Sequence, residues 1–135
     1  MSRFKNKAGN SEEGSLVFVK PADLARAEFT GVVAEGEFAE ALPNRFDEDK
    51  HDFKIIADTS LKFSGVDKDG TKYTKEVNPG DTLVVNGAGN LNFLMRKVSP
   101  GELCQIVYEG KREIARGQRK GTLAHTFEVA YGEEE

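Results

Sequence analysis

The sequence predicts an all-β fold class, β-rich with one short helix, and three observations support this prediction. Short segments rich in Val, Ile, Phe, Tyr and Thr recur along the chain, separated by turn signals that contain Gly, Pro, Asn or Asp. Helical periodicity occurs in one place, where Leu91, Leu94, Met95 and Val98 follow the spacing i, i+3, i+4, i+7. The length of 135 residues suits a single domain that can bury a substantial core.

The strands are justified one by one along the chain. Residues 15–20 (SLVFVK) are β-rich and stop at Pro21. Residues 27–42 have apolar side chains on both faces and internal glycines, which is typical of a bent barrel strand. DKDG at 67–70 predicts a tight hairpin. The other strands are expected at 53–66, with a break near Asp58 and Thr59, and at 71–77, 82–86, 103–109 and 122–131.

The predicted helix follows the strand at 82–86 and lies between the third and fourth main strands. This order is the layout of a five-stranded Greek-key OB-fold barrel. The segment 15–20 is then an extra N-terminal strand. We therefore expect a flexible N-terminal arm at 1–14, an OB-fold nucleic-acid-binding domain at 15–131 and an acidic C-terminal tail at 132–135.

Composition limits the location of the protein. No run of about 18 apolar residues exists, so we expect no membrane span. The first residues contain no apolar signal core, which argues against secretion. The single cysteine, Cys104, cannot form an internal disulfide, and this fits a reducing compartment. We expect a cytoplasmic protein.

The stretch VVNGAGNLNFLM (84–95) raises the possibility of a phosphate-binding loop. Gly87 and Gly89 fit a dinucleotide fingerprint, but the third glycine position holds Asn92 and no Walker lysine follows. A tight turn into the helix, with Asn86 or Asn90 as its cap, explains the same residues. A nucleotide-dependent enzyme that uses the Gly87/Gly89 turn remains the alternative function.

Other candidate sites give little support for catalysis or metal binding. DEDKHD (47–52) clusters acidic residues around His51 without defined ligand spacing, so a solvated loop is favoured. His125 is on an apolar strand face, which favours a hydrogen-bonded core histidine over a catalytic base. Cys104 shares a face with Ile106 and Tyr108, which indicates packing. We expect no catalytic residue, no metal site, no cofactor and no enzymatic activity.

Basic residues gather in the last predicted loop, although the net charge of the chain is −4. The segment GKREIARGQRKG (110–121) carries five cations and one acid, and in an OB-fold this loop borders the ligand groove. The loop between the first two main strands flanks the other side of that groove. The candidate residues of the two loops are Lys111, Arg112, Arg116, Arg119 and Lys120, and Arg45, Phe46 and Lys50.

Cations alternate with aromatic residues on the strands between these loops. The candidates are Phe53, Lys54, Lys62, Phe63, Lys72 and Tyr73. Single-stranded nucleic acid requires this combination, because cations neutralise phosphates and aromatic faces stack on any base. For each residue taken singly, a solvated strand face or a core aromatic explains the pattern equally well. As a set, the candidates favour a nucleic-acid groove, and a protein-interaction adaptor is a further alternative.

The C-terminus ends in three acidic residues, Glu133, Glu134 and Glu135. Such a tail can compete with DNA phosphates for a basic groove, or recruit a basic surface of a partner. Its simplest alternative is a solubilising end.

The last third of the chain resembles the single-stranded DNA-binding proteins of tailed bacteriophages. The resemblance rests on NGAG (86–89), VSPGE (98–102), YEGK (108–111), Lys120-Gly121 and AHTFEV (124–129). It implies an OB-fold that coats single-stranded DNA during phage replication and recombination, in the host cytoplasm. It also implies that the acidic tail contacts replication or recombination proteins. The oligomeric state stays open.

Overall fold

The computed structural model describes residues 15–43, 50–113 and 123–132, and within these ranges strands dominate. The elements in chain order are β1 (Leu16–Val19), α1 (Pro21–Arg26), β2 (Gly31–Pro43), β3 (His51–Ala57), β4 (Leu61–Val66), β5 (Lys72–Val77), β6 (Thr82–Asn86), α2 (Leu91–Met95), β7 (Leu103–Glu113) and β8 (Leu123–Tyr131). The predicted strands all form. The predicted break near Asp58 is confirmed, because β3 and β4 belong to different sheets.

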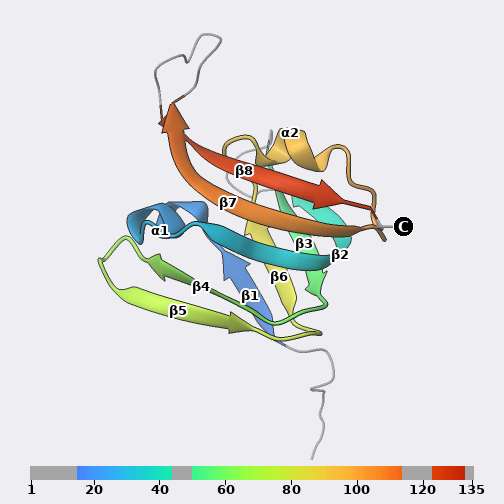
Figure 1. Cartoon of the computed structure of the whole chain (residues 1–135), viewed down its shortest axis with the longest axis horizontal. Helices are drawn as coiled ribbons and strands as arrows, with labels where there is room; N and C mark the ends of the chain where they lie inside the picture. Colours follow the sequence, from blue (N-terminus) through green and yellow to red (C-terminus); the bar gives the residue numbers. More distant parts are fainter. Residues whose placement is uncertain (1–14, 44–49, 114–122, 133–135) are drawn as a thin grey trace, which may run out of the picture.

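A six-stranded mixed sheet forms the centre of the molecule, in the order β1-β6-β3-β2-β7-β8 (Figure 1). β1 runs parallel to β6, and the other neighbours are antiparallel. Among the described strands no pairing joins β8 to β6, so hydrogen bonds do not close the sheet into the predicted five-stranded barrel.

One continuous core lies against the inner face of this sheet. Val17, Leu83 and Ile55 contribute to it from three adjacent strands, and Ile106 contributes from β7. A register shift between Val32 and Ala34 lets β2 bury two consecutive residues, Val33 and Ala34, which regular alternation would place on opposite faces. A local irregularity therefore decides which side chains of this long strand reach the core.

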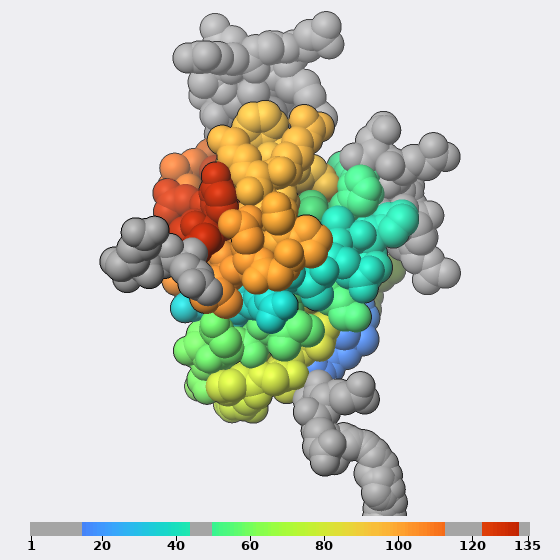
Figure 2. Space-filling model, turned by 90° about the vertical axis from the view of Figure 1, so that its right-hand side faces the viewer, coloured from blue at the N-terminus to red at the C-terminus, as the bar shows by residue number. Residues whose placement is uncertain are grey.

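The hairpin of β4 and β5 forms a separate two-stranded sheet, as DKDG predicted. Asp67 stabilises the turn, because its Oδ1 accepts hydrogen bonds from the backbone N–H groups of Asp69 and Thr71, each at 2.9 Å. The hairpin lies at the opposite end of the molecule from α2 in both views (Figures 1 and 2).

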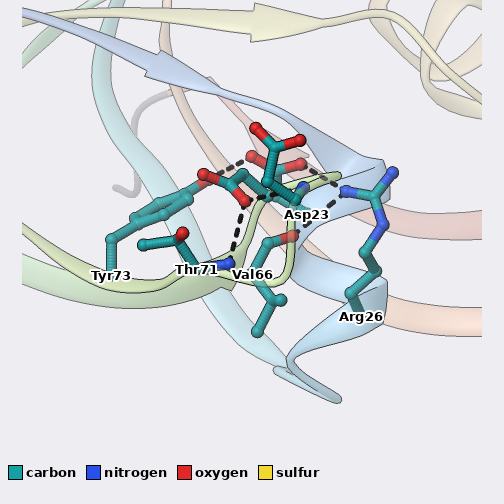
Figure 3. Close-up of polar contacts among 7 residues, drawn as sticks. Asp23, Arg26, Val66, Thr71 and Tyr73 are labelled. Atoms are coloured by element: carbon teal, nitrogen blue, oxygen red, sulfur yellow. Dashed lines mark hydrogen bonds and ion pairs between the residues drawn. The ribbon is translucent and has the colours of Figure 1, made fainter.

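Helix α1 was not predicted, so the expectation of one helix was wrong. Pro21 was interpreted as the end of the first strand, but it also starts a helix, a position that suits its fixed φ and missing N–H. Asp23 fastens this helix to the hairpin (Figure 3). Its Oδ2 accepts a 2.7 Å hydrogen bond from the Tyr73 hydroxyl, and its Oδ1 accepts one from Arg26 at 2.7 Å.

Neither α1 nor α2, the helices of the described ranges, is long and apolar enough to cross a membrane.

Candidate functional site: a basic cleft beside the glycine turn

An open cleft of about 520 Å³ lies where the β7–β8 pair meets the turn that precedes α2. We call it the basic cleft, because three cationic side chains line it. Its walls are Lys50, Ala88, Gly89, Asn90, Lys111, Arg112, Leu123, Ala124, His125 and Thr126. These residues come from four separate segments of the chain, which the sheet brings together.

A bulge in β7 places the cations of this strand. The register with β8 shifts between Tyr108 and Lys111, at Gly110, whose φ is +89°. Beyond the bulge, Lys111 pairs with His125 and Arg112 pairs with Ala124. Both cations are exposed, and Arg112 Nη1 is 3.8 Å from Glu109 Oε1. A bulge at a strand end often redirects side chains, and here it leaves two positive charges at the mouth of the cleft.

The glycine turn forms the opposite wall. Gly89 has φ +57°, and a Cβ there would overlap the backbone carbonyl of His125. A Cβ on Gly87 would overlap the carbonyl of His51. Close approach of the neighbouring chain segments therefore requires both glycines, a reason that the tight-turn interpretation did not include. The turn nevertheless lies in the same cleft as the basic residues, a proximity that the sequence did not indicate.

Asn86 and Asn90 were the predicted helix caps, and the structure gives their side chains other partners. Asn90 caps no backbone group of α2 with its side chain. Its amide instead bonds to the backbone of Phe127 in β8, accepting from the N–H at 2.7 Å and donating to the carbonyl at 3.0 Å. Asn86 donates to Asp52 at 3.3 Å. The Asn90 side chain thereby fixes the position of α2 against the sheet.

His125 is a wall residue of the cleft whose pKa the fold shifts. Its Nδ1 lies 2.7 Å from the hydroxyl of the fully buried Tyr108, which confirms the prediction of a hydrogen-bonded histidine. Burial lowers the pKa of His125, and the charges of Lys111 and Lys50 lower it further. Burial also raises the pKa of Tyr108, so this phenol stays protonated. The cleft thus contains positive charge that disfavours a further proton.

Two of the predicted stacking residues belong to the core. Phe53 is 4% exposed and packs against Phe38, with ring centroids 6.2 Å apart. Phe63 is 1% exposed and meets Phe29 edge to face. Alternation on β3 and β4 turns both rings inward, so neither presents an open face to a base. The structure assigns them to packing.

The predicted cations of the hairpin lie away from the basic cleft. Lys62 is 3.9 Å from Glu76 on the facing strand, and both side chains are largely exposed. Lys72 and Tyr73 line a different cleft beside α1, where the Tyr73 hydroxyl is bonded to Asp23. Lys54 is on the outer face of β3, 3.7 Å from Glu40. The predicted set is therefore divided between at least two regions.

Several predicted residues lie outside the described ranges. These are Arg45 and Phe46 of the first loop, Arg116, Arg119 and Lys120 of the basic loop, and the tail residues Glu133, Glu134 and Glu135. Their predicted roles stay predictions. The described residues that flank the two loops, Lys50 on one side and Arg112 on the other, both line the basic cleft.

The structure also adds residues that the sequence did not single out for binding. Leu123 is 61% exposed in the cleft wall and offers an apolar surface beside the cations. Asn90 was considered only as a cap, and His125 only as a core residue. The signal available in the sequence was the asparagine- and glycine-rich turn itself, for which the sequence predicts either a phosphate-binding loop or a tight turn.

The described residues give no arrangement that suggests metal or thiol chemistry. No group of three His, Cys, Asp or Glu side chains in these ranges could hold a metal ion. Cys104 is buried, and burial raises the pKa of its thiol to about 11, with Asp58 and Glu102 adding to the shift. A thiol with this pKa is a poor nucleophile at neutral pH. This fits the predicted packing role.

Comparisons with family models, with curated proteins and with solved structures found no match to this chain.

Proposed function

We propose that the protein binds single-stranded DNA without sequence preference, through the basic cleft, and that it catalyses no reaction. The observation that carries this proposal is the gathering of Lys50, Lys111 and Arg112 around one open cleft in a chain of net charge −4. Phosphates are the ligand that such a local positive field attracts, and the exposed Leu123 gives the bases an apolar contact.

The strand order supports an OB-fold as the framework of this function. Without β1 and the hairpin, the sheet reads β6-β3-β2-β7-β8, which is third-second-first-fourth-fifth in chain order. This is the order of a five-stranded Greek-key barrel opened between its third and fifth strands, with α2 between the third and fourth. In OB-folds the loops between the first two strands and between the last two strands flank bound oligonucleotides. Here Lys50 and Arg112, described residues near the ends of the corresponding segments, line the cleft.

The resemblance of the last third to phage single-stranded DNA-binding proteins supports the same proposal. Its motifs include the glycine turn, which contributes Ala88 and Gly89 to the cleft, and the YEGK segment, which contributes Lys111. On this proposal the protein coats and protects single strands during phage replication and recombination, and Glu133, Glu134 and Glu135 contact partner proteins.

The test compares binding of fluorescently labelled oligo(dT) and of duplex DNA at several salt concentrations. Three substitutions, Lys50→Gln, Lys111→Gln and Arg112→Gln, should weaken binding to oligo(dT) and reduce the log–log salt slope by about 2, because each phosphate contact on a single strand contributes about 0.7. Equal affinity for duplex, or binding that ignores salt, would contradict the proposal.

A matched control removes the same charge from the hairpin. The variant with Lys62→Gln, Lys72→Gln and Lys75→Gln has the same net charge as the cleft variant, and it changes residues at the opposite end of the molecule from α2. We expect its salt slope to match that of the unaltered protein. If the hairpin variant loses affinity and the cleft variant does not, the binding site lies on the hairpin.

A free nucleotide is the second candidate ligand, because Gly89 and Asn90 line the same cleft as the cations. Thermal unfolding with ATP, with NAD and with oligo(dT) separates the two. A rise in Tm with the oligonucleotide supports DNA binding. A rise with ATP or NAD alone supports the nucleotide-dependent alternative.

A further inference from the structure

The ring of Phe93 is exposed on the outer side of α2. Leu91 and Met95, the first and last residues of this helix, are buried in the core, whereas Phe93 is 59% exposed. Helical geometry places the residue midway between two buried neighbours on the opposite side. Packing in the described core therefore gives no reason for an aromatic residue at this position.

Two cations accompany this ring. The guanidinium carbon of Arg96 and the Nζ of Lys97 each lie 5.9 Å from its centroid. Both side chains are exposed and follow Phe93 within four residues. An exposed aromatic ring with two exposed cationic side chains beside it provides both interactions that single-stranded nucleic acid uses. The ring can stack on a base, and the cations can neutralise its phosphates.

Phe93 follows the basic cleft closely in sequence, only three residues after Asn90. Gly89 and Asn90 line the cleft, and α2 begins at the next residue. The side chain of Asn90 is bonded to the Phe127 backbone, which fixes the start of the helix relative to β8. Residues three positions apart on a helix have Cβ atoms roughly 5–6 Å apart. A strand leaving the cleft past Asn90 thus reaches Phe93 within one helical turn.

We propose that Phe93 is a stacking platform for a base of the same DNA strand whose phosphates occupy the basic cleft, and that Arg96 and Lys97 neutralise the phosphates next to that base. This inference rests on the proposed function and extends its site from the β7–β8 pair onto α2. The simpler alternative is that the aliphatic stems of Arg96 and Lys97 merely cover the ring.

The chain contains no tryptophan, which allows a direct test. Phe93→Trp introduces one indole on α2, and Phe18→Trp introduces one on β1 at a residue that is 46% exposed. Strand β1 lies away from α2 (Figure 1). Oligo(dT) should quench the fluorescence of Phe93→Trp in proportion to binding and leave that of Phe18→Trp unchanged. Equal quenching of both, or of neither, would overturn the inference.

Affinity provides the second readout. Phe93→Ala should weaken oligo(dT) binding by roughly 5- to 150-fold, the range for loss of one stacked base, whereas Phe18→Ala should not. Circular dichroism checks that both variants fold. Removing Arg96 and Lys97 together should lower the salt slope by about 1.4.

The two proposals fail in different ways. If labelled oligo(dT) does not bind the unaltered protein, the proposed function is wrong. If it binds normally and Phe93→Ala binds equally well, only the role of Phe93 is wrong.

Discussion

The hydroxyl oxygen of Tyr108 lies 2.7 Å from Nδ1 of His125, and this contact joins the buried centre of the sheet to the wall of the basic cleft. Tyr108 is fully buried, so its hydroxyl requires a partner within the fold. His125 supplies that partner from the neighbouring strand. The same imidazole lies near the charges of Lys111 and Lys50, which links the stability of the core to the electrostatics of the cleft.

The environment of His125 predicts that the free energy of unfolding depends on pH. The folded protein lowers the pKa of His125 below its ordinary value of 6.5, so the unfolded chain takes up the proton first as the pH falls. The free energy of unfolding should therefore fall between about pH 7.5 and the lowered pKa, and level off below it. Urea unfolding at about pH 8 and about pH 6 measures the change.

The chain has two histidines, which provides the control. His125→Gln should lose most of this pH dependence, whereas His51→Gln, which changes an exposed residue, should retain it. Equal pH dependence in His125→Gln and the unaltered protein would show that another group is responsible.

Gly89→Ala tests whether the glycine turn serves packing. The substitution adds a Cβ that overlaps the His125 carbonyl at a φ of +57°. Gly80→Ala also has a positive φ, +97°, but its Cβ would meet open space. Gly80→Ala should cost about 1–2 kcal/mol for the backbone conformation alone, and Gly89→Ala should cost more by at least about 1 kcal/mol. Equal losses in denaturant unfolding would mean that the turn tolerates a side chain.

Tyr73→Phe separates a structural role from a binding role. The change removes the hydroxyl that donates to Asp23, a carboxylate only 7% exposed, and should lower the free energy of unfolding by about 1–3 kcal/mol. Binding of oligo(dT) by the folded variant should be unchanged, because the hydroxyl faces α1 rather than the basic cleft (Figure 3). Tyr131→Phe, at a residue 48% exposed, is the stability control. Weaker DNA binding in Tyr73→Phe would show that the Tyr73 hydroxyl contributes to the DNA-binding site.

The sequence by itself determined the strands and α2, although it did not predict α1. DKDG specified the hairpin because its Asp and Gly suit a tight turn, and the spacing of Leu91, Leu94 and Met95 specified the position of α2. Alternation also identified the buried face of β7, with Cys104, Ile106 and Tyr108. These features depend on neighbours within a few residues, so periodicity and turn chemistry suffice to predict them.

Tertiary structure decided which of the chemically suitable residues share a site. Lys50 directly precedes β3, whereas Lys111 follows a bulge in β7, and only strand pairing brings them to the same cleft. Composition could not tell Phe53, which faces the core, from Phe93, which faces outward. The direction of a side chain depends on register, on bulges and on the packing of α2, and these are set by contacts between segments far apart in the sequence.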